Sequence, residues 1–297
     1  MQGKDTTKTT FDQLFEPIFS KHFSGLLQQL EVDKYVKKLT AVKFIVLMVF
    51  AQQHQLKSLQ EISLSLHNKN LSRAIKLDSI SFSQLSRKLQ TMALQTVQSL
   101  FKDMVNQVGI NTGFKPIRQE LGRMYLSDSS IVSLSITRYR WATFRKTKGG
   151  VKLHLRLRFF DGGALPDAAV LTNAKKADKT QMDKLVIEEK GAFNVFDRAY
   201  VDYKKFDEYC AKGIFFASRL KVNALVEVIK ERPVKAKSPI KRDCIVRLGK
   251  SGLNQMHHLL RMIETEDTEG KPVTIITNNF ALSAEEIGDI YPTFLTK

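Results

Sequence analysis

The sequence contains few residues that cross-link or interrupt a chain. Only 2 of its 297 residues are cysteines, and Cys210 and Cys244 lack the close spacing of a zinc site. Such sparse cysteine use is typical of a protein in a reducing compartment, so we expect the cytoplasm. No glycine or proline occurs between Leu26 and Val108, which argues against tight turns and strands there.

Long apolar runs and acidic residues are also scarce. The longest apolar run, residues 41–51, contains Lys43 and is far shorter than the ~20 residues of a membrane span. The first ten residues are polar and do not resemble a signal peptide. Lys and Arg number 47 against 30 Asp and Glu, which gives a net charge of +17. This excess favours a polyanionic partner, and DNA or RNA is the first candidate.

The first third of the chain has apolar residues at helical spacing. After a polar tail at residues 1–10, this pattern predicts a helical domain over residues 11–115. Within it, residues 11–26 predict an amphipathic helix, and residues 32–39 and 41–53 predict two more.

Residues 58–89 are compatible with a helix-turn-helix. Ser58 is placed to cap a short helix with Glu61 as its capping-box partner, residues 67–79 resemble a linker, and a second helix begins at Ser81. In a helix-turn-helix the second helix enters the major groove of DNA. A plain helical bundle with a solvated charged face fits the same pattern. The exposed residues of the second helix would be Ser83, Gln84, Arg87 and Lys88.

Strand-like segments begin after residues 111–116, where glycine and proline mark a change in composition. We place a domain boundary there and predict a second domain over residues 116–297, with helices at 178–187 and 202–211 among its strands. This mixture is typical of α+β or α/β folds. Predicted strands cover residues 123–126, 131–136, 151–160, 168–171 and 193–197, with turns at 148–150 and 162–163. A β-rich block follows at about residues 213–280, with strands at 214–220, 225–229, 244–248, 258–263 and 273–277.

The segment from Arg118 to Arg158 holds ten Lys and Arg but only two acids. Apolar and cationic residues alternate over residues 151–159, so one face of this strand is cationic. Phosphate contacts position DNA and dominate its affinity, so the segment is a candidate phosphate-binding surface close to Asp128. A half-exposed sheet with a solvated basic face would show the same alternation. The candidate DNA-binding residues are Arg138, Arg140, Arg145, Lys146, Lys148, Lys152 and Arg156.

Two aromatic rings lie within this basic segment. Trp141 is the only tryptophan of the chain. It has two possible roles: stacking on an unpaired base, or a partly buried position in the core, which is more frequent for tryptophan. His154 lies on the cationic strand face, where it would order water or phosphate, although a lone histidine is more often structural.

Two aspartates follow short apolar runs. Asp128 comes after residues 124–126, and Asp197 comes after residues 193–196. Open α/β sheets carry their chemistry at the carboxyl ends of strands, and two carboxylates there can hold Mg²⁺ or Mn²⁺ through oxygen. Pairs of such ions drive in-line attack on phosphodiesters. An aspartate after a strand is otherwise a turn or cap residue.

Asp128 and the run Asp-Arg-Ala-Tyr at residues 197–200 resemble the first two acids of DDE transposases of bacterial insertion sequences, most closely the group with a helical N-terminal domain. The resemblance implies an N-terminal helical bundle followed by a ribonuclease-H-like mixed sheet with helices and a β-rich insertion. It also implies metal-dependent cleavage and strand transfer, with Asp128 and Asp197 as catalytic metal ligands and Arg198 as a DNA contact.

The same resemblance extends to the partners and the cellular location. It implies double-stranded DNA at transposon terminal repeats, target DNA and a homodimer assembled on DNA. It also implies a nucleoid-associated protein in the bacterial cytoplasm.

The last segment departs from the family pattern. Ser283 and Glu286 fit the capping box of a final helix. In the family this helix continues through a Tyr, an Arg and a glutamate that is the third metal ligand. Tyr291 fits the Tyr of this pattern, but Phe294 stands at the position of the Arg. Pro292 should also break the helix. We therefore expect a C-terminally truncated member that lacks the final catalytic helix, leaves one sheet face uncovered and has impaired activity. The alternative is a DNA-binding transposase remnant that acts as an inhibitor, or a helix-turn-helix DNA binder.

Overall fold

The computed structural model describes residues 15–116, 119 and 122–294. The predicted polar tail and the first residues of the predicted helix at 11–26 lie outside the described residues. The chain divides into two compact units, Met1–Gly113 and Phe114–Lys297. The division falls within residues 111–116, where the composition of the sequence changes. We describe each unit by itself.

The N-terminal unit is a bundle of short helices around α3 (Ala41–Gln53), which is buried along most of its length. The predicted helix at residues 41–53 is confirmed. The helix predicted at residues 32–39 is wrong, because Tyr35 has a positive φ of 65° and the Asp33 carboxylate accepts the backbone N–H of Ala41 at 2.8 Å. The remaining elements are η1 (Glu16–Phe19), α2 (Lys21–Gln29), α4 (Leu59–Leu64), η2 (Ser65–His67), α5 (Lys69–Ile75), α6 (Phe82–Thr91) and α7 (Leu94–Thr112).

The candidate helix-turn-helix contains an additional helix. Ser58 caps α4 as predicted, accepting the backbone N–H of Glu61 at 3.1 Å. The predicted linker at residues 67–79 instead contains α5, because Asn68 caps two backbone N–H groups there. Ser81 and Gln84 then form the capping box that opens α6. The two predicted helices are therefore separated in the chain by a third.

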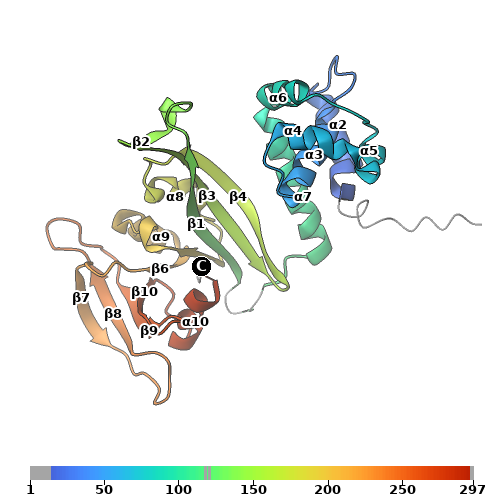
Figure 1. Ribbon diagram of the computed structural model, residues 1–297. Helices are drawn as coiled ribbons and strands as arrows, with labels where there is room; N and C mark the ends of the chain where they lie inside the picture. Colours follow the sequence, from blue (N-terminus) through green and yellow to red (C-terminus); the bar gives the residue numbers. More distant parts are fainter. Residues whose placement is uncertain (1–14, 117–118, 120–121, 295–297) are drawn as a thin grey trace, which may run out of the picture. The chain divides into compact units, whose positions relative to one another are not determined.

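The C-terminal unit is built on one mixed sheet of ten strands, in the order β2-β3-β1-β5-β6-β10-β9-β8-β7 with β4 paired to β3 (Figure 1). β1 is antiparallel to β3 and parallel to β5, which is parallel to β6. Strands predicted in the β-rich block appear as β6 to β10. The strands are β1 (Arg123–Leu134), β2 (Thr143–Arg145), β3 (Lys148–Phe160), β4 (Gly163–Asn173), β5 (Ala192–Phe196), β6 (Phe215–Arg219), β7 (Val226–Glu231), β8 (Arg242–Leu248), β9 (Leu260–Glu266) and β10 (Pro272–Thr277).

The long strands β1 and β3 differ from the prediction. β1 is one continuous strand, although two were expected, and the predicted turn at residues 148–150 lies inside β3. Gly149 is needed for close packing rather than for a turn, since a Cβ atom there would lie 2.9 Å from the carbonyl oxygen of Leu134 on β1. The turn predicted at residues 162–163 is confirmed at Gly162, which has a φ of 101°, and Gly163 is already the first residue of β4.

Helices cover both faces of this sheet (Figure 1). One face packs against α8 (Met182–Leu185) and α9 (Tyr203–Lys212), and short 3-10 turns lie at η4 (Arg140–Ala142), η5 (Asp178–Gln181) and η6 (Arg198–Tyr200). The other face packs against α10 (Ala284–Phe294). A helical N-terminal region followed by a mixed sheet with helices is the predicted fold class. Every helix within the described part of the chain is too short or too polar to span a lipid bilayer.

The final helix corrects one expectation. Its Ser283–Glu286 capping box is present, with the Glu286 N–H donating to Ser283 Oγ at 3.1 Å. However, α10 continues through Pro292, and Ile287 and Ile290 are buried against the sheet. The face that we expected to be uncovered is therefore covered by α10, because tertiary packing outweighs the local preference of proline.

Candidate active site

The register of two parallel strands brings Asp128 and Asp197 together. Ser127 on β1 is paired with Phe196, the last residue of β5, and an aspartate directly follows each of them. Asp197 retains an extended backbone, with φ −74° and ψ 162°. Neighbouring strands lie about 4.8 Å apart, so the two carboxylates occupy adjacent positions on the sheet.

Both carboxylates project from the same face. Side chains alternate along a strand, and Met124 and Leu126 of β1 pack with Phe193 and Val195 of β5 in the core beneath α10. By that alternation Asp128 and Asp197 point to the α10 side. Both residues are half-buried, and no hydrogen bond or ion pair of either carboxylate occurs within the described part of the chain.

Asp128 lies in the middle of a strand rather than at its end. β1 continues to Leu134, paired only with β3 beyond Ser127. The sequence suggested a strand end because the apolar run stops there. The run stops because β5 ends, which leaves the following residues of β1 more exposed.

The opposite face of the sheet carries a buried polar network. His154 is fully buried, with Nε2 2.9 Å from Thr172 Oγ1 and Nδ1 3.3 Å from both the Tyr200 hydroxyl and Asp178 Oδ1. Burial, opposed by Asp178 and assisted by Lys152, lowers the pKa of His154. His154 is therefore a structural histidine that does not face Asp128.

Tyr200 connects this network with the two aspartates. Burial, followed by the negative charges of Asp178, Asp128 and Asp197, raises the pKa of Tyr200 well above its usual value. The phenol therefore stays protonated and packs between Phe196 and His154. Asp178 carries no signal of this role in the local sequence, because only its contacts with remote residues reveal it.

Lys152 and Arg156 are not positioned as predicted. Asp128 is paired with Leu155 across β1 and β3, so both cations project from the other face. Lys152 lies 3.1 Å from Asp178, and Arg156 donates to Asp167 at 2.7 and 3.1 Å; both side chains are mostly buried. The predicted phosphate surface beside Asp128 is wrong for these two residues.

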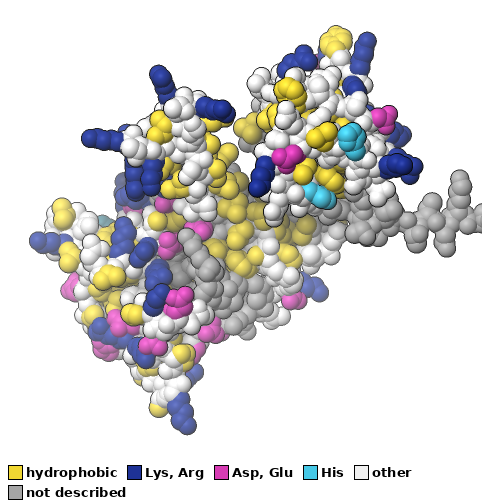
Figure 2. Space-filling view, viewed as in Figure 1, with side chains coloured by type: hydrophobic (Ala, Val, Ile, Leu, Met, Phe, Trp, Pro, Cys, Tyr) yellow, Lys and Arg dark blue, Asp and Glu magenta, His cyan; other side chains and the backbone are white. Residues whose placement is uncertain are grey.

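The other predicted cations of the segment are exposed. They surround the end of the sheet at β2, where Figure 2 shows Lys and Arg side chains projecting from the surface. None has an ion-pair partner among the residues that the structure describes. These cations are Arg138, Arg140, Arg145, Lys146 and Lys148.

Trp141 lies among these cations and is 66% exposed. The expectation of a partly buried core tryptophan is therefore wrong. Asn173 on β4 donates to the carbonyl of Trp141 at 2.8 Å, and the neighbouring Ala142 is buried, so the local backbone is anchored while the indole faces solvent.

The remaining candidate DNA contacts differ in exposure. Arg198 directly follows Asp197 and is exposed. Arg87 on α6 is also exposed, whereas Lys88 is mostly buried and donates to Asp33 Oδ1 at 3.0 Å. Of the predicted pair on α6, only Arg87 is free to contact a ligand.

Two carboxylates on one face, without partners in the described chain, fit a divalent cation. Carboxylate oxygens are hard ligands that suit Mg²⁺, and a cation would offset the repulsion between the two negative charges. No group of three acids, histidines or cysteines that could hold a metal occurs among the described residues. On α10, Glu285 accepts from Ser238 at 3.0 Å and Glu286 belongs to the capping box. The site therefore offers two ligands from the described chain.

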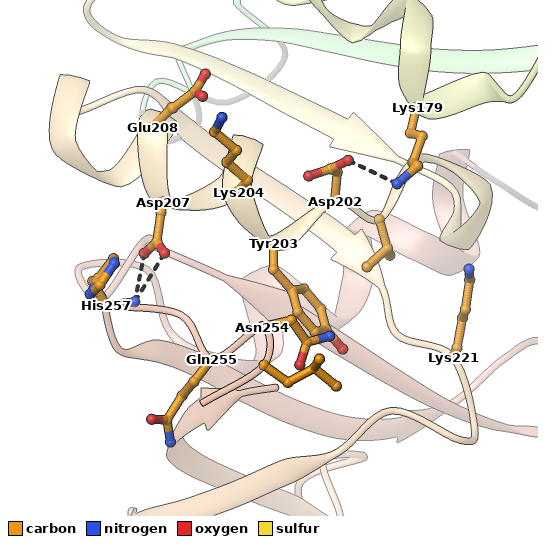
Figure 3. A pocket seen from close by; sticks show the side chains of 12 residues that line it. Lys179, Asp202, Tyr203, Lys204, Asp207, Glu208, Lys221, Asn254, Gln255 and His257 are labelled. Atoms are coloured by element: carbon orange, nitrogen blue, oxygen red, sulfur yellow. Dashed lines mark hydrogen bonds and ion pairs between the residues drawn. The ribbon is translucent and has the colours of Figure 1, made fainter. Parts of the chain in front are cut away.

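A pocket of about 710 Å³ lies beyond the end of β5, beside the start of α9 (Figure 3). Figure 3 shows Asp207 pointing to the backbone of His257, whose N–H donates to it at 2.9 Å, and Asp202 paired with Lys179 at 3.1 Å. The pocket leaves no local signal in the sequence, because its walls come from distant segments. Three cations and three carboxylates line the pocket, so its charge favours neither an anion nor a cation. These residues are Lys179, Lys204, Lys221, Asp202, Asp207 and Glu208.

Comparison with known proteins identifies relatives along most of the chain. It is 25% identical over 251 residues to a Geobacillus stearothermophilus protein named "Probable transposase for insertion sequence element IS5377", covering 82% of this chain and 62% of that protein. It is 26% identical over 156 residues to "Putative transposase y4zB" of Sinorhizobium fredii, covering 51% of this chain and 43% of that protein. The chain thus spans less than two thirds of the length of either relative.

A solved structure also aligns with the chain. It is the piggyBac transposase in a synaptic complex with hairpin DNA, at a TM-score of 0.40 and 9% identity, covering 95% of this chain and 65% of that one. This likeness is too distant to bear on function.

Family models give the assignment. Residues 6–74 match a domain of unknown function, DUF4372. Residues 124–293, more than half of the chain, match the transposase DDE domain, and this match includes both aspartates at the β1–β5 edge. The chain therefore belongs to the DDE transposase family.

Proposed function

We propose that this protein is the transposase of an insertion sequence and that Asp128 and Asp197 are its metal-holding catalytic residues. The proposal is supported by a pair of half-buried carboxylates, Asp128 on β1 and Asp197 directly after β5. They follow the paired residues Ser127 and Phe196 and have no counter-charge among the described residues. Two like charges so close together destabilise each other unless a cation lies between them.

The reaction that this site supports is cleavage and rejoining of DNA. Water and then a freed 3′-hydroxyl attack phosphorus in line, displacing the opposite oxygen. A divalent ion, Mg²⁺ or Mn²⁺, supplies charge stabilisation and an activated attacking oxygen when bound. Asp128 and Asp197 would hold that ion, and the exposed Arg198 would contact a phosphate beside it.

The partners follow from this reaction. They are the double-stranded terminal repeats of the transposon and the target DNA, with two copies of the chain assembled on DNA, at the nucleoid of a bacterial cytoplasm. The exposed cations at β2 and Arg87 on α6 supply phosphate contacts in this proposal.

A second function is favoured by one observation. Among the described residues no group of three acids, histidines or cysteines could hold a metal, and phosphoryl transfer requires metal ions held in a fixed geometry. The alternative is a DNA-binding protein that does not cut and that inhibits an active partner.

Substitution of either aspartate tests the catalytic proposal. We expect Asp128→Asn and Asp197→Asn to reduce Mg²⁺-dependent nicking of DNA carrying the terminal repeats that flank the gene by more than about 100-fold. Even outer-shell partners of a metal contribute 10- to 100-fold, so a direct ligand should contribute more. Asp161→Asn, at an exposed turn of the same unit, is the matched control and should nick normally.

DNA binding measured alongside nicking separates the two functions. Nicking by the unmutated chain that disappears in both variants, with binding retained, supports the transposase. Normal binding without nicking by the unmutated chain supports the inhibitor. Nicking that persists in Asp128→Asn and Asp197→Asn would rule out these residues as ligands.

A further inference from the structure

The end of the sheet at β2 presents aromatic rings to solvent. Trp141 is 66% exposed and Tyr139 is 42% exposed. Their backbone is held by local hydrogen bonds, from the Tyr139 N–H to the Ser135 carbonyl and from the Ala142 N–H to the Tyr139 carbonyl, each at 2.9 Å. Large aromatic side chains are usually mostly buried, so a fixed segment that exposes two of them indicates a surface that meets a partner.

The charge around these rings is of one sign. No acidic residue occurs between Asp128 and Asp161 in the sequence, and the five exposed cations near β2 have no ion-pair partner in the described chain. We call this surface, made of Tyr139, Trp141 and those five cations, the aromatic tip. A nucleic acid matches the positive charge and the aromatic rings of this surface, because it is a polyanion whose bases have flat apolar faces.

Exposed aromatic rings favour unpaired nucleotides over a duplex. A base that is paired and stacked inside a duplex has no free face, whereas an unpaired base can stack on an indole. Cations alone would be sufficient to bind duplex phosphates. The rings therefore distinguish this surface from a plain basic patch.

The aromatic tip is close enough to the two aspartates to act on the same DNA. Leu134 lies six positions after Asp128 on β1, which corresponds to about 20 Å along a strand. That length equals about six base pairs at 3.4 Å each. Nucleotides unpaired by cleavage at Asp128 and Asp197 would be within this distance.

We propose that the aromatic tip binds unpaired nucleotides of DNA, with one base stacked on the indole of Trp141 and the neighbouring phosphates held by the surrounding cations. The proposal relies on the proposed transposase function for the source of unpaired DNA. Its binding step needs neither a metal nor the two aspartates.

Intrinsic fluorescence provides a direct test, because Trp141 is the only tryptophan and its emission can be excited selectively over that of the tyrosines. The full chain, in EDTA, is titrated with a 12-nucleotide oligothymidylate, with the same sequence as a duplex, and with vesicles of anionic lipid. We expect the single strand to quench the emission and the duplex to bind with little quenching. Equal quenching by both forms of DNA, or a response to vesicles alone, would overturn the proposal.

Substitutions then measure the contribution of the ring. We expect Trp141→Ala to weaken single-strand binding roughly 5- to 140-fold, the range given by one stacked base, and to leave duplex binding nearly unchanged. Trp141→Phe should retain most of the affinity. Tyr35→Ala, which removes a 90% exposed ring from the N-terminal unit, is the matched control. Unchanged single-strand binding in Trp141→Ala, with folding verified by circular dichroism, would contradict the assignment.

The two proposals fail separately. Quenching in EDTA together with an absence of nicking would support nucleotide binding by the aromatic tip and contradict the catalytic proposal. Nicking without quenching would support the catalytic proposal and contradict nucleotide binding by the aromatic tip.

Discussion

Asp243 and Asp128 are both strand aspartates, yet their surroundings differ. Asp243 is 3% exposed, and Arg261 donates to its two oxygens at 2.9 and 2.7 Å. Arg261 also donates to the carbonyl of Leu282, just before α10. A buried charge is stable only with a partner, so Asp243 has a structural role. Asp128 is half-buried without one, which leaves it available for a cation.

His154 makes stability depend on pH. Its pKa is lowered in the folded chain, mainly by burial, so the unfolded chain binds more protons as the pH falls. The stabilisation by neutral His154 is complete above the unfolded pKa of about 6.5 and decreases below it. We predict that the free energy of unfolding in urea decreases below about pH 6.5 and that His154→Gln reduces this decrease.

The exposed His257 of the same unit provides the control. His257→Gln should leave the pH dependence of the unfolding free energy as in the unmutated chain. If His154→Gln behaves in the same way, the histidine is not the source of the pH effect.

At the scale of elements, α10 is the helix that covers the face with the two aspartates. Ile287 is fully buried there against the sheet. We predict that Ile287→Ala lowers the free energy of unfolding by about 2–5 kcal/mol, the usual cost of such a cavity. Leu253→Ala removes a 79% exposed side chain and should cost far less in the same urea titration. Equal costs would mean that α10 does not pack as described.

Regular elements were predictable wherever one local signal determines them. The helix at residues 41–53 follows from apolar content, α4 and α6 from their caps, and β6 to β10 from short β-prone runs. Interactions between remote residues determine the rest. Gly149 looked like a turn residue because its neighbour Leu134 on β1 is not apparent from local sequence.

The candidate site was predictable in part for the same reason. The resemblance and the apolar runs identified Asp128 and Asp197, and the strand register brings them together. Alternation showed that Lys152 and Arg156 share a face but not that this face lies opposite Asp128. Their acidic partners, Asp178 and Asp167, occur later in the chain and carry no motif.

At the scale of the whole molecule, the net charge of +17 should make DNA binding depend strongly on salt. We predict that the logarithm of the affinity for duplex DNA falls linearly as the logarithm of the salt concentration rises. Each phosphate contact contributes about 0.9 to that slope, so replacing Arg145, Lys146 and Lys148 by Gln should reduce it by up to about 2.7.

A matched triple variant removes the same charge elsewhere. Replacing the exposed Lys175, Lys184 and Lys190 by Gln changes the net charge equally without touching the aromatic tip. An equal loss of slope in both variants would show that only the total charge matters. A loss confined to the first would locate phosphate contacts at the tip.

The uninterrupted β1 strand also constrains how the gene can change. Each residue of a strand faces the side opposite to that of its neighbour, so inserting or deleting one codon between Arg123 and Asp128 would turn Asp128 toward the His154 side of the sheet. Inserting or deleting two codons would return the Asp128 side chain to its original face of the sheet. It would also move Asp128 along the strand, so that it no longer lies beside Asp197. Length variation among descendants of this gene should therefore accumulate in loops and be absent from these few codons.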